Sequence, residues 1–254
     1  MLKDYLGNYD EVGGIKLYPV RLLDWEEFSP LANKFLLYGY DFLYFRTGAT
    51  EETKLFDLII AFVSGEVIQT ESLECESIKD LERMFSIVLR KEMKFSLNSD
   101  STLWGLKSED GDFINRNNYD EIREIIMRQN LLHEPLIVED EYSQEIIDNG
   151  IKAMSKGNGE FSFESMVSYV CCLKGIDSKE LDDYSYYRLR CDVEMLQRVE
   201  TNRAIHIYRS QGAKATTINE FKGFECKKNP YSWEALFTKY DSREDDKMAQ
   251  FMSQ

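Results

Sequence analysis

The stretch from Phe113 to Pro135 constrains the fold most strongly, because the period of its apolar residues changes within it. It begins as a short apolar run and continues with the 3.6-residue period of an amphipathic helix. Asn118, with Glu121 three residues later, has the pattern of a capping box, and Asn130 and Pro135 end the helix. The stretch separates a first half that contains strands from a second half that is almost wholly helical.

Two stretches of the first half have the apolar spacing of amphipathic helices. Thr50 begins the first predicted helix and Gly65 ends it. Ser77, with Asp80 three residues later, begins the second. We expect the two helices to supply the core of the first half. Their apolar stripes are Leu55, Leu58, Ile59 and Phe62 in the first, and Ile78, Leu81, Phe85, Val88 and Leu89 in the second.

Shorter features precede these helices. Residues 1–14 are polar and predicted to be loose, and Ile15–Val20 alternates weakly, as an edge strand does. Asp24 is expected to cap a helix. Ser29–Pro30 is expected to begin a new helix, because proline suits the first helical position and not the interior. An aromatic run at residues 38–45 fits either a core helix or a buried strand.

A period of about two predicts strands after the second helix. Met93–Asn98, Leu103–Leu106 and Phe113–Ile114 are short apolar segments, and Asp110–Gly111 supplies a turn between the last two. They are expected to form a minor antiparallel hairpin or a three-stranded piece near residues 93–115. The predicted fold class is therefore mainly α, with a small β element.

The second half is predicted to be helical. Ser162 caps a helix over Phe163–Lys174, which Gly175 ends. Ser185 begins the longest helix, which runs to about Ser210. One face of this helix carries the apolar residues Leu189, Val193, Leu196 and Ile207.

The glycines of Gly157–Gly159 mark the expected boundary between the two halves. We therefore divide the chain into residues 1–156, a mainly helical unit with the β element, and residues 160–212, a helical unit. Residues 213–254 are expected to form an extended tail with a short aromatic helix.

The acidic composition narrows the classes of partner. The chain has 46 acidic and 31 basic residues, a net charge of −15 and an isoelectric point near 4.7. Such a surface repels nucleic-acid phosphates and anionic lipids, so we expect neither a nucleic-acid nor a membrane partner. No apolar run approaches the ~20 residues of a membrane helix, and the polar residues 1–10 predict no signal peptide. The expected location is intracellular.

The cysteine pattern indicates a reducing compartment. The count is odd and no pair has the CxxC spacing, so we expect free thiols, most of them buried. The five cysteines are Cys75, Cys171, Cys172, Cys191 and Cys226.

The best candidate for a metal site has the spacing of an EF-hand loop. Asp110, Asp112 and Glu121 occupy its first, third and twelfth positions. However, Ile114 stands at the fifth position, where it cannot bind a metal ion, and Asn115 replaces the glycine that the loop needs. A hairpin turn followed by a helix start therefore explains these residues better. A metal-dependent hydrolase that uses the three acids is kept as an alternative.

Two further pairs have ordinary structural explanations. His133 beside Glu134 is typical of a helix end, because no nucleophile is evident nearby. Cys171 and Cys172 are expected to be buried, inert thiols in an apolar helix. We therefore predict no catalytic, cofactor-binding or metal-binding residues.

An aromatic segment at residues 229–237 stands out from polar sequence near the end of the chain. It is either a peptide that docks into a groove of a partner or a last helix packed on the core, and both readings stay open. The candidate partner-binding residues are Trp233, Leu236, Phe237 and Tyr240.

The order of several segments carries a resemblance to a known group of proteins. The central segment INRNNYDEIREIIMRQNLLHEP is similar to one found in proteins from the structural modules of phages and prophages of Gram-positive bacteria. The similarity includes KLYPVRLLDWEEFSPLANKFLL upstream, and FSFESMVSYVCCLKGIDSKELDDYSYYRLRCDVEMLQRVETNRAIHIYRS and NPYSWEALF downstream. It covers the chain from about Gly14 to Phe237.

This pattern resembles small acidic proteins of the phage tail module, similar to tail assembly chaperones. The resemblance implies a non-enzymatic protein without a cofactor, which binds the tape measure protein and recruits tail tube subunits in the host cell cytoplasm. The chain is longer than the short chaperones of that group. A structural protein that remains in the virion is therefore an alternative, and self-association into a homo-oligomer is left open. The resemblance assigns a role to no individual residue.

Overall fold

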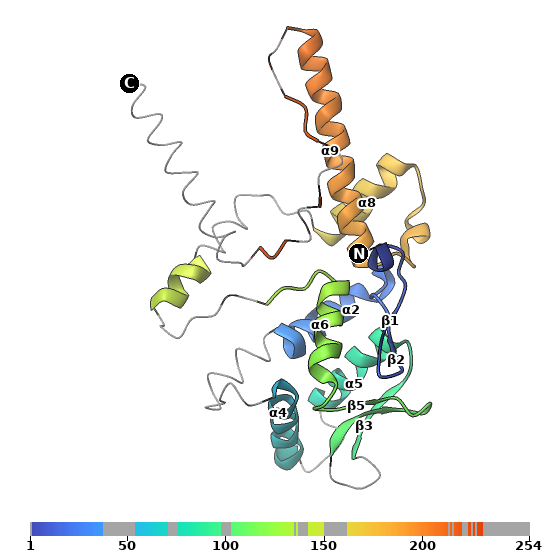
Figure 1. The fold of residues 1–254 in the computed structure, drawn as a ribbon, viewed down its shortest axis with the longest axis vertical. Coiled ribbons are helices and arrows are strands. Elements are labelled where there is room, and N and C mark those ends of the chain that lie inside the picture. The colour runs from blue at the N-terminus through green and yellow to red at the C-terminus, as the bar shows by residue number, and fades with distance from the viewer. Residues whose placement is uncertain are drawn as a thin grey trace.

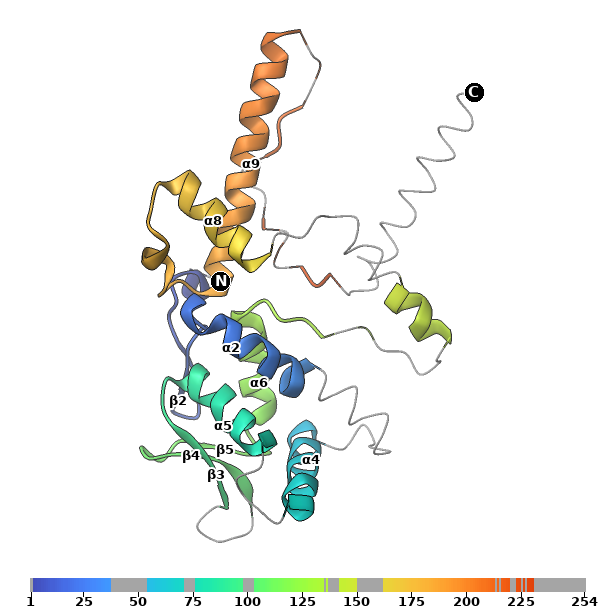
Figure 2. The same cartoon turned by 180° about the vertical axis from the view of Figure 1, so that it is seen from behind.

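The computed structural model is mainly helical and also contains antiparallel strands (Figures 1 and 2). This confirms the predicted fold class in outline, although the strand content is larger than a minor hairpin. The structure describes residues 2–37, 54–70, 76–97, 103–134, 136, 142–149, 162–212, 214, 216–219, 223–224, 226 and 228–230.

The helices lie along the whole described chain. In order they are α1 (Leu2–Tyr5), α2 (Leu22–Ala32), the π-helix η1 (Asn33–Leu37), α4 (Leu55–Thr70), α5 (Glu76–Leu89), α6 (Tyr119–Gln129), α8 (Phe163–Lys174), the 3₁₀ helix η2 (Ser178–Leu181) and α9 (Tyr186–Ser210). Residues 142–149 are also helical. None of the helices in the described ranges is long and apolar enough to cross a membrane.

Two small antiparallel sheets contain the described strands. β1 (Asp10–Val12) pairs with β2 (Ile15–Leu17), and β3 (Met93–Leu97), β4 (Trp104–Ser108) and β5 (Phe113–Ile114) form a sheet in that order. The second sheet confirms the three-stranded form of the predicted element.

The polar N-terminal residues are not loose, contrary to the prediction, because α6 holds them. Arg128 on α6 donates to both carboxylate oxygens of Asp4 at 2.7 Å and to Asp10 at 2.5 Å. Gln129 also donates to Asp10, at 3.0 Å. These contacts join residues more than a hundred positions apart, and so a local sequence pattern does not predict them.

Helix α2 continues through Pro30, where the sequence predicted a new helix start. Pro30 is exposed and so lies on the outer side of the helix, while Phe28 and Ala32 on either side of it are buried in the core, which offsets the backbone hydrogen bond lost at proline. The helix starts after Arg21, whose guanidinium pairs with Asp24 at 2.8 Å. The predicted capping role of Asp24 is therefore wrong.

Helix α4 also runs past its predicted end at Gly65. A glycine inside a helix costs only about 1 kcal/mol relative to alanine, which continued helical structure on both sides can outweigh. The predicted start at Thr50 lies outside the described residues. Helix α5 matches its prediction closely, because all five residues of its predicted apolar stripe are buried.

Two hydrophobic clusters form the core. The larger lies among the first sheet, α2, η1, α4, α5, α6 and the second sheet, and the smaller joins α8, η2 and α9 to Leu22 of α2. Phe163 and Tyr186 contact both clusters, and the rings of Trp25 and Tyr186 stack with their centroids 3.7 Å apart. The boundary at Gly157–Gly159 lies outside the described residues, so the division into residues 1–156, 160–212 and 213–254 stays a prediction.

Helix α6 closes the end of η1 with side-chain hydrogen bonds. Tyr119 is fully buried and donates to the carbonyl of Phe35 at 3.2 Å. The guanidinium of Arg123 donates twice to the carbonyl of Leu36, at 3.2 and 2.7 Å. The last carbonyl groups of a helix have no partner within the helix, so α6 supplies what η1 lacks.

The C-terminal end of α6 makes similar bonds to the residues around β2. Gln129 donates to the carbonyl of Leu17 at 3.1 Å, and the side-chain oxygen of Asn130 accepts from the backbone N–H of Val20 at 3.0 Å. Asn130 also follows the last residue of α6, as predicted. Its amide nitrogen donates to Ile126 within the same helix, so both ends of this buried amide are bonded.

Asn118 stands at the predicted N-cap position of α6 but does not form the predicted capping box. Its backbone is helical, with φ of −119° and ψ of −8°, whereas a capping side chain needs an extended backbone. The amide instead accepts from the N–H of Asn115 at 2.8 Å and donates to the carbonyl of Phe113 at 2.9 Å. Asn118 therefore shapes the turn that leads from β5 into α6.

The helix boundaries of the second half are confirmed. The hydroxyl of Ser162 accepts from the N–H of Ser165 at 3.2 Å, and Gly175 ends α8 with φ of 66°. The hydroxyl of Ser185 accepts from the N–H of Arg188 at 3.1 Å at the start of α9. Each of these boundaries includes a bond or a backbone angle set within one turn of helix, and so they could be predicted.

Asn130→Ala is expected to lower the free energy of unfolding by about 1–3 kcal/mol, because it leaves the buried N–H of Val20 without an acceptor. Asn117→Ala removes the same side chain from an exposed position and should change stability by less than about 0.5 kcal/mol. Urea unfolding followed by circular dichroism measures both. Equal effects of the two substitutions would contradict the assigned role of Asn130.

Candidate interaction surfaces

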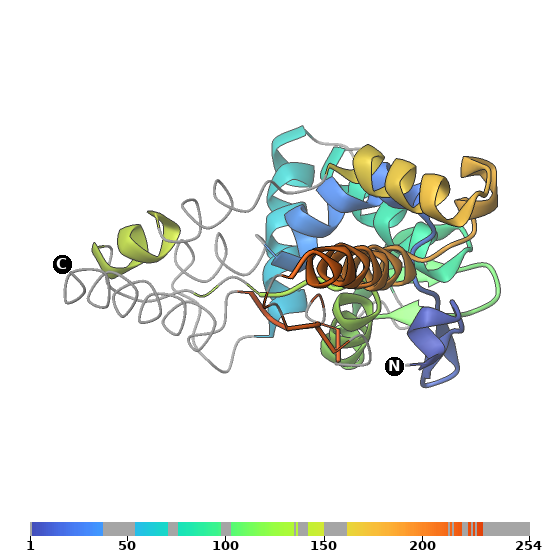
Figure 3. The same ribbon diagram turned by 90° about the horizontal axis from the view of Figure 1, so that it is seen from above.

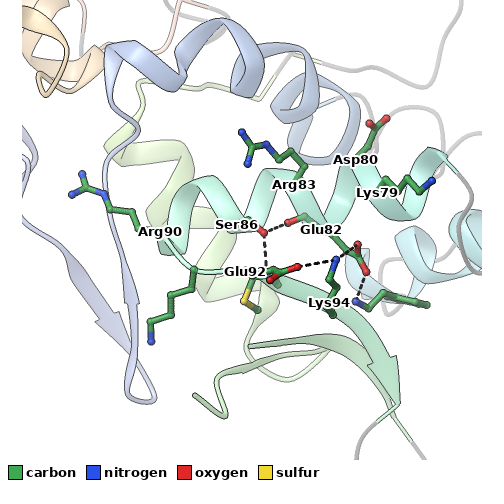
Figure 4. Close-up of a pocket in the computed structure, with 11 residues that line it drawn as sticks. Lys79, Asp80, Glu82, Arg83, Ser86, Arg90, Glu92 and Lys94 are labelled. Carbon is green, nitrogen blue, oxygen red and sulfur yellow. Dashed lines mark hydrogen bonds and ion pairs between the residues drawn. The ribbon is translucent and has the colours of Figure 1, made fainter. Parts of the chain in front are cut away.

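An open groove lies between the exposed side of α5 and the start of β3 (Figure 4). Its volume is about 1080 Å³. Its lining consists of Lys79, Asp80, Glu82, Arg83, Ser86, Arg90, Lys91, Glu92, Met93, Lys94 and Phe95.

Side chains from one side of α5 line one wall of the groove. Lys79, Arg83 and Ser86 follow one another at spacings of four and three residues, so they lie on one side of α5, and Arg90, with φ of 55°, directly follows the last residue of the helix. The apolar residues between them face the core. The periodicity that predicted the buried stripe of α5 therefore also predicts this polar side of the helix. Nothing in the sequence indicated that the polar side lines a groove.

The groove is locally basic in a strongly acidic protein. Five of its lining residues are basic and three are acidic, against a net charge of −15 for the chain. Most of these charges are already paired. Arg83 binds Glu27, and Lys94 lies 3.1 Å from Glu92. In the described ranges, Lys79 and Arg90 have no carboxylate within ion-pair distance.

Arg90 is held in place by a ring instead of an acid. Its guanidinium lies 4.5 Å from the centroid of Tyr18, a cation–π distance. Burial and the nearby charge of Arg21 lower the pKa of Arg90. Lys79 lies in the first turns of α5 and Arg90 directly follows its last residue, so these two cations stand toward opposite ends of the helix. This arrangement suits an extended segment with separated negative charges.

The backbone edge of β3 inside the groove is already bonded. The hydroxyl of Ser86 accepts from the N–H of Met93 at 3.0 Å, and Glu82 accepts from the N–H of Phe95 at 2.7 Å. Exposed strand edges invite pairing with another chain. Side chains of α5 therefore accept the hydrogen bonds of the Met93 and Phe95 N–H groups. The groove offers a ligand charged side chains, and these two backbone donors are already occupied.

The three acids of the alternative metal site do not come together. Asp110 and Asp112 both bind Lys91, at 3.0 and 2.8 Å, and these hydrogen bonds raise the pKa of Lys91 to about 12. Glu121 lies exposed in the first turn of α6. Within the described ranges, no group of three or more His, Cys, Asp or Glu residues is placed to hold a metal ion.

The other predicted pairs differ in their surroundings. His133 is half-buried, and among the described residues its Nε2 atom has no hydrogen-bond partner, while the adjacent Glu134 pairs with Arg123 at 2.6 Å. Burial lowers the pKa of His133. Cys171 is partly exposed and Cys172 is exposed, so the expected burial of this pair was wrong. Cys171 packs against the edge of the smaller cluster, in which Met166 and Val170 are buried, whereas Cys172 faces outward.

The second surface is the distal part of α9, which projects beyond the rest of the described fold (Figures 1 and 2). Seen from above, in Figure 3, this helix is viewed nearly along its axis, and the elements of the body lie around its base. On one side of the projecting part, Asn202 is only 5% exposed because the later chain around Ile218 packs against it. The amide of Asn202 donates to the carbonyl of Ile218 at 2.8 Å and accepts from its N–H at 2.7 Å.

The opposite side of this projection carries an apolar seam, which we define as Ala204, Ile207 and Tyr208. All three are exposed, Ile207 to 59% and Tyr208 to 58%. At about 100° per residue they lie together and roughly opposite Asn202. The sequence placed Ile207 on one face of α9 with Leu189, Val193 and Leu196. Leu189 and Val193 are buried, whereas Ile207 is exposed because the helix extends beyond the elements that cover its first turns.

The structure does not describe most of the aromatic segment at residues 229–237. Its four candidate partner-binding residues are outside the described part of the chain: Trp233, Leu236, Phe237 and Tyr240.

Comparisons with protein-family models, with curated proteins and with solved structures gave no match to this chain.

His133 should make stability depend on pH. Its pKa is lower in the folded than in the unfolded protein, so the unfolded state binds more protons, and stability should fall as the pH drops below about 6.5. His133→Gln removes this titration, so its unfolding free energy should fall less between about pH 7 and pH 5.5. Urea unfolding at several pH values provides the measurement. Parallel pH profiles for the two proteins would contradict the expectation.

Proposed function

We propose that this protein is a non-enzymatic, chaperone-like assembly factor of a phage tail, which binds the tape measure protein, the tail tube protein or both. The observation that carries the proposal is the apolar seam on the projecting part of α9. The ordered resemblance of the sequence to tail-module proteins supports the choice of partner. Such a factor would act in the cytoplasm of the host cell.

The geometry of α9 suits a helical partner. The helix has 25 residues, a length of about 37 Å, and its seam repeats at the spacing of three and four residues by which helices pack against each other. Tape measure proteins are long helices with apolar faces, which a chaperone must cover before assembly. The seam offers an apolar surface of matching period.

Charge around the seam favours a partner with acidic flanks. Residues 201–212 contain Arg203 and Arg209 and no acidic residue, although the chain as a whole has a net charge of −15. The projecting end is thus basic relative to the acidic body. Complementary charge raises the association rate and fixes the orientation of a complex more than it raises affinity.

The small size of the seam is consistent with a complex that must come apart. Three side chains bury far less than the ~1,600 Å² of a standard stable interface, and contacts of low area are typical of transient complexes. A chaperone has to release its partner when the tail assembles. The groove along α5, with its unpaired Lys79 and Arg90, offers a second contact area for acidic segments of the partner.

Ile207→Glu combined with Tyr208→Glu should weaken capture of the tape measure protein at least tenfold, because each substitution places a charge in the apolar contact. His206→Glu adds an acid to the same helix nearly opposite the seam and should leave capture within about twofold. A pull-down with purified tape measure and tail tube proteins, titrated by concentration, measures the affinities. Equal loss in both variants would rule out the seam as the contact. If the wild-type protein bound neither partner, the proposed function would be wrong.

An assembly factor should also be absent from finished particles. Mass spectrometry of purified virions should detect the tape measure and tail tube proteins but not this chain. A stoichiometric amount in the particle would favour the alternative of a structural virion component.

A further inference from the structure

We propose that Cys191 and Cys226 are an oxidisable thiol pair, which closes to a disulfide and fastens Gly223, Phe224 and Cys226 covalently to α9. The Sγ atoms of the two cysteines lie 3.9 Å apart. A disulfide bond is about 2 Å long, so small side-chain rotations bring the sulfurs together.

The backbone around Cys226 is already held against α9 by two charged side chains. The N–H of Cys226 donates to Glu194 at 2.9 Å, and the guanidinium of Arg198 donates to the carbonyl of Gly223 at 2.7 Å. The same guanidinium lies 5.5 Å from the centroid of the Phe224 ring. Glu194 and Arg198 also bind each other. The reacting sulfurs therefore meet inside an ordered contact.

The helical period explains why these groups act together. Cys191, Glu194 and Arg198 follow at spacings of three and four residues, and Asn202 continues the series by four. They form one side of α9, along which the later part of the chain returns in the opposite direction. Ile218 meets Asn202, Gly223 meets Arg198, and Cys226 meets Cys191.

The reaction needs a two-electron oxidant, for which hydrogen peroxide is the simplest class. Cys191 is only 1% exposed and Cys226 is partly exposed, so peroxide reaches Cys226 first. The Cys226 thiolate attacks one peroxide oxygen, the O–O bond breaks, and water leaves with formation of a sulfenic acid. The sulfur of Cys191 then displaces the sulfenic oxygen as a second water. Two thiols are oxidised to one disulfide, and one peroxide is reduced to two waters.

The surroundings make this reaction slow at neutral pH. The hydrogen bond with Cys191, burial and the nearby carboxylate of Glu194 raise the pKa of Cys226, so little thiolate is present. We therefore expect the rate of disulfide formation to increase steadily between about pH 7 and pH 9. Cys171 and Cys172 lie on another helix, and Cys172 is exposed, so they compete for oxidant without the same geometric advantage.

The experiment treats the reduced, full-length protein with hydrogen peroxide, blocks the remaining thiols in denaturant, and maps tryptic peptides by mass spectrometry. The expected product joins peptide 191–198 to peptide 223–227, and reactive thiols fall from five to three. Oxidation in concentrated urea is the control for geometry, because the preference for this pair should disappear when the chain is unfolded. A link that forms equally among all cysteines in the folded protein would overturn the proposal.

Matched serine variants test the assignment. Cys226→Ser should abolish the linked product, whereas Cys172→Ser, at an exposed position, should leave its yield unchanged. The wild-type peptide map decides the question even if Cys226→Ser folds poorly. A folded wild-type protein that loses thiols but yields no 191–226 link would also overturn the proposal. The seam lies on a different side of α9, so disulfide formation should not change capture of a helical partner, and the two proposals fail independently.

Discussion

The polar side chains of α6 are the constraint on which the first half of the structure depends. The backbone groups of Leu17, Val20 and Leu36 that α6 binds lie away from water, and a missing hydrogen bond to such a buried group costs about 1–3 kcal/mol. Gln129 and Asn130 bond the backbone around β2, and Arg123 bonds the end of η1. One helix therefore fixes the place of the first hairpin and of the helix that follows it. Because β2 and α2 in turn contact α5, the position of the groove also depends on these bonds.

What the sequence predicted correctly has a local cause. Serine at position 162 or 185 bonds an N–H three residues later, and glycine at 175 adopts a positive φ, so each boundary is set within one turn of helix. The failures have distant causes. Pro30 remains inside α2 because the helix turns it toward water and packs its neighbours into the core. The N-terminal residues are ordered because Arg128 holds Asp4. Only the folded arrangement brings such pairs together.

The candidate surfaces were less predictable than the fold. A basic side of α5 is visible in the sequence, but a row of charges is usually just a solvated face, and only the packing of β3 beside it makes a groove. The partners of Lys91 were read as candidate metal ligands, because two acids separated by one residue fit both a loop that binds a cation and a turn that binds a lysine. For Ile207, periodicity gave the face correctly, but it carries no information about how far the covering elements extend.

The length of α9 relative to α8 explains why its two sides differ. Helix α8, with 12 residues, is about 18 Å long, about half the length of the 25-residue α9, and packs against α9 near its base (Figures 1 and 2). Farther along α9, polar side chains bind the described residues of the returning chain, Asn202 and Arg198 among them. A helix stabilised there by apolar burial would have turned Ile207 toward the returning chain. Because a polar side of the helix meets that chain instead, the apolar side stays exposed among the described residues, and an amphipathic partner can cover it without displacing any contact that they make.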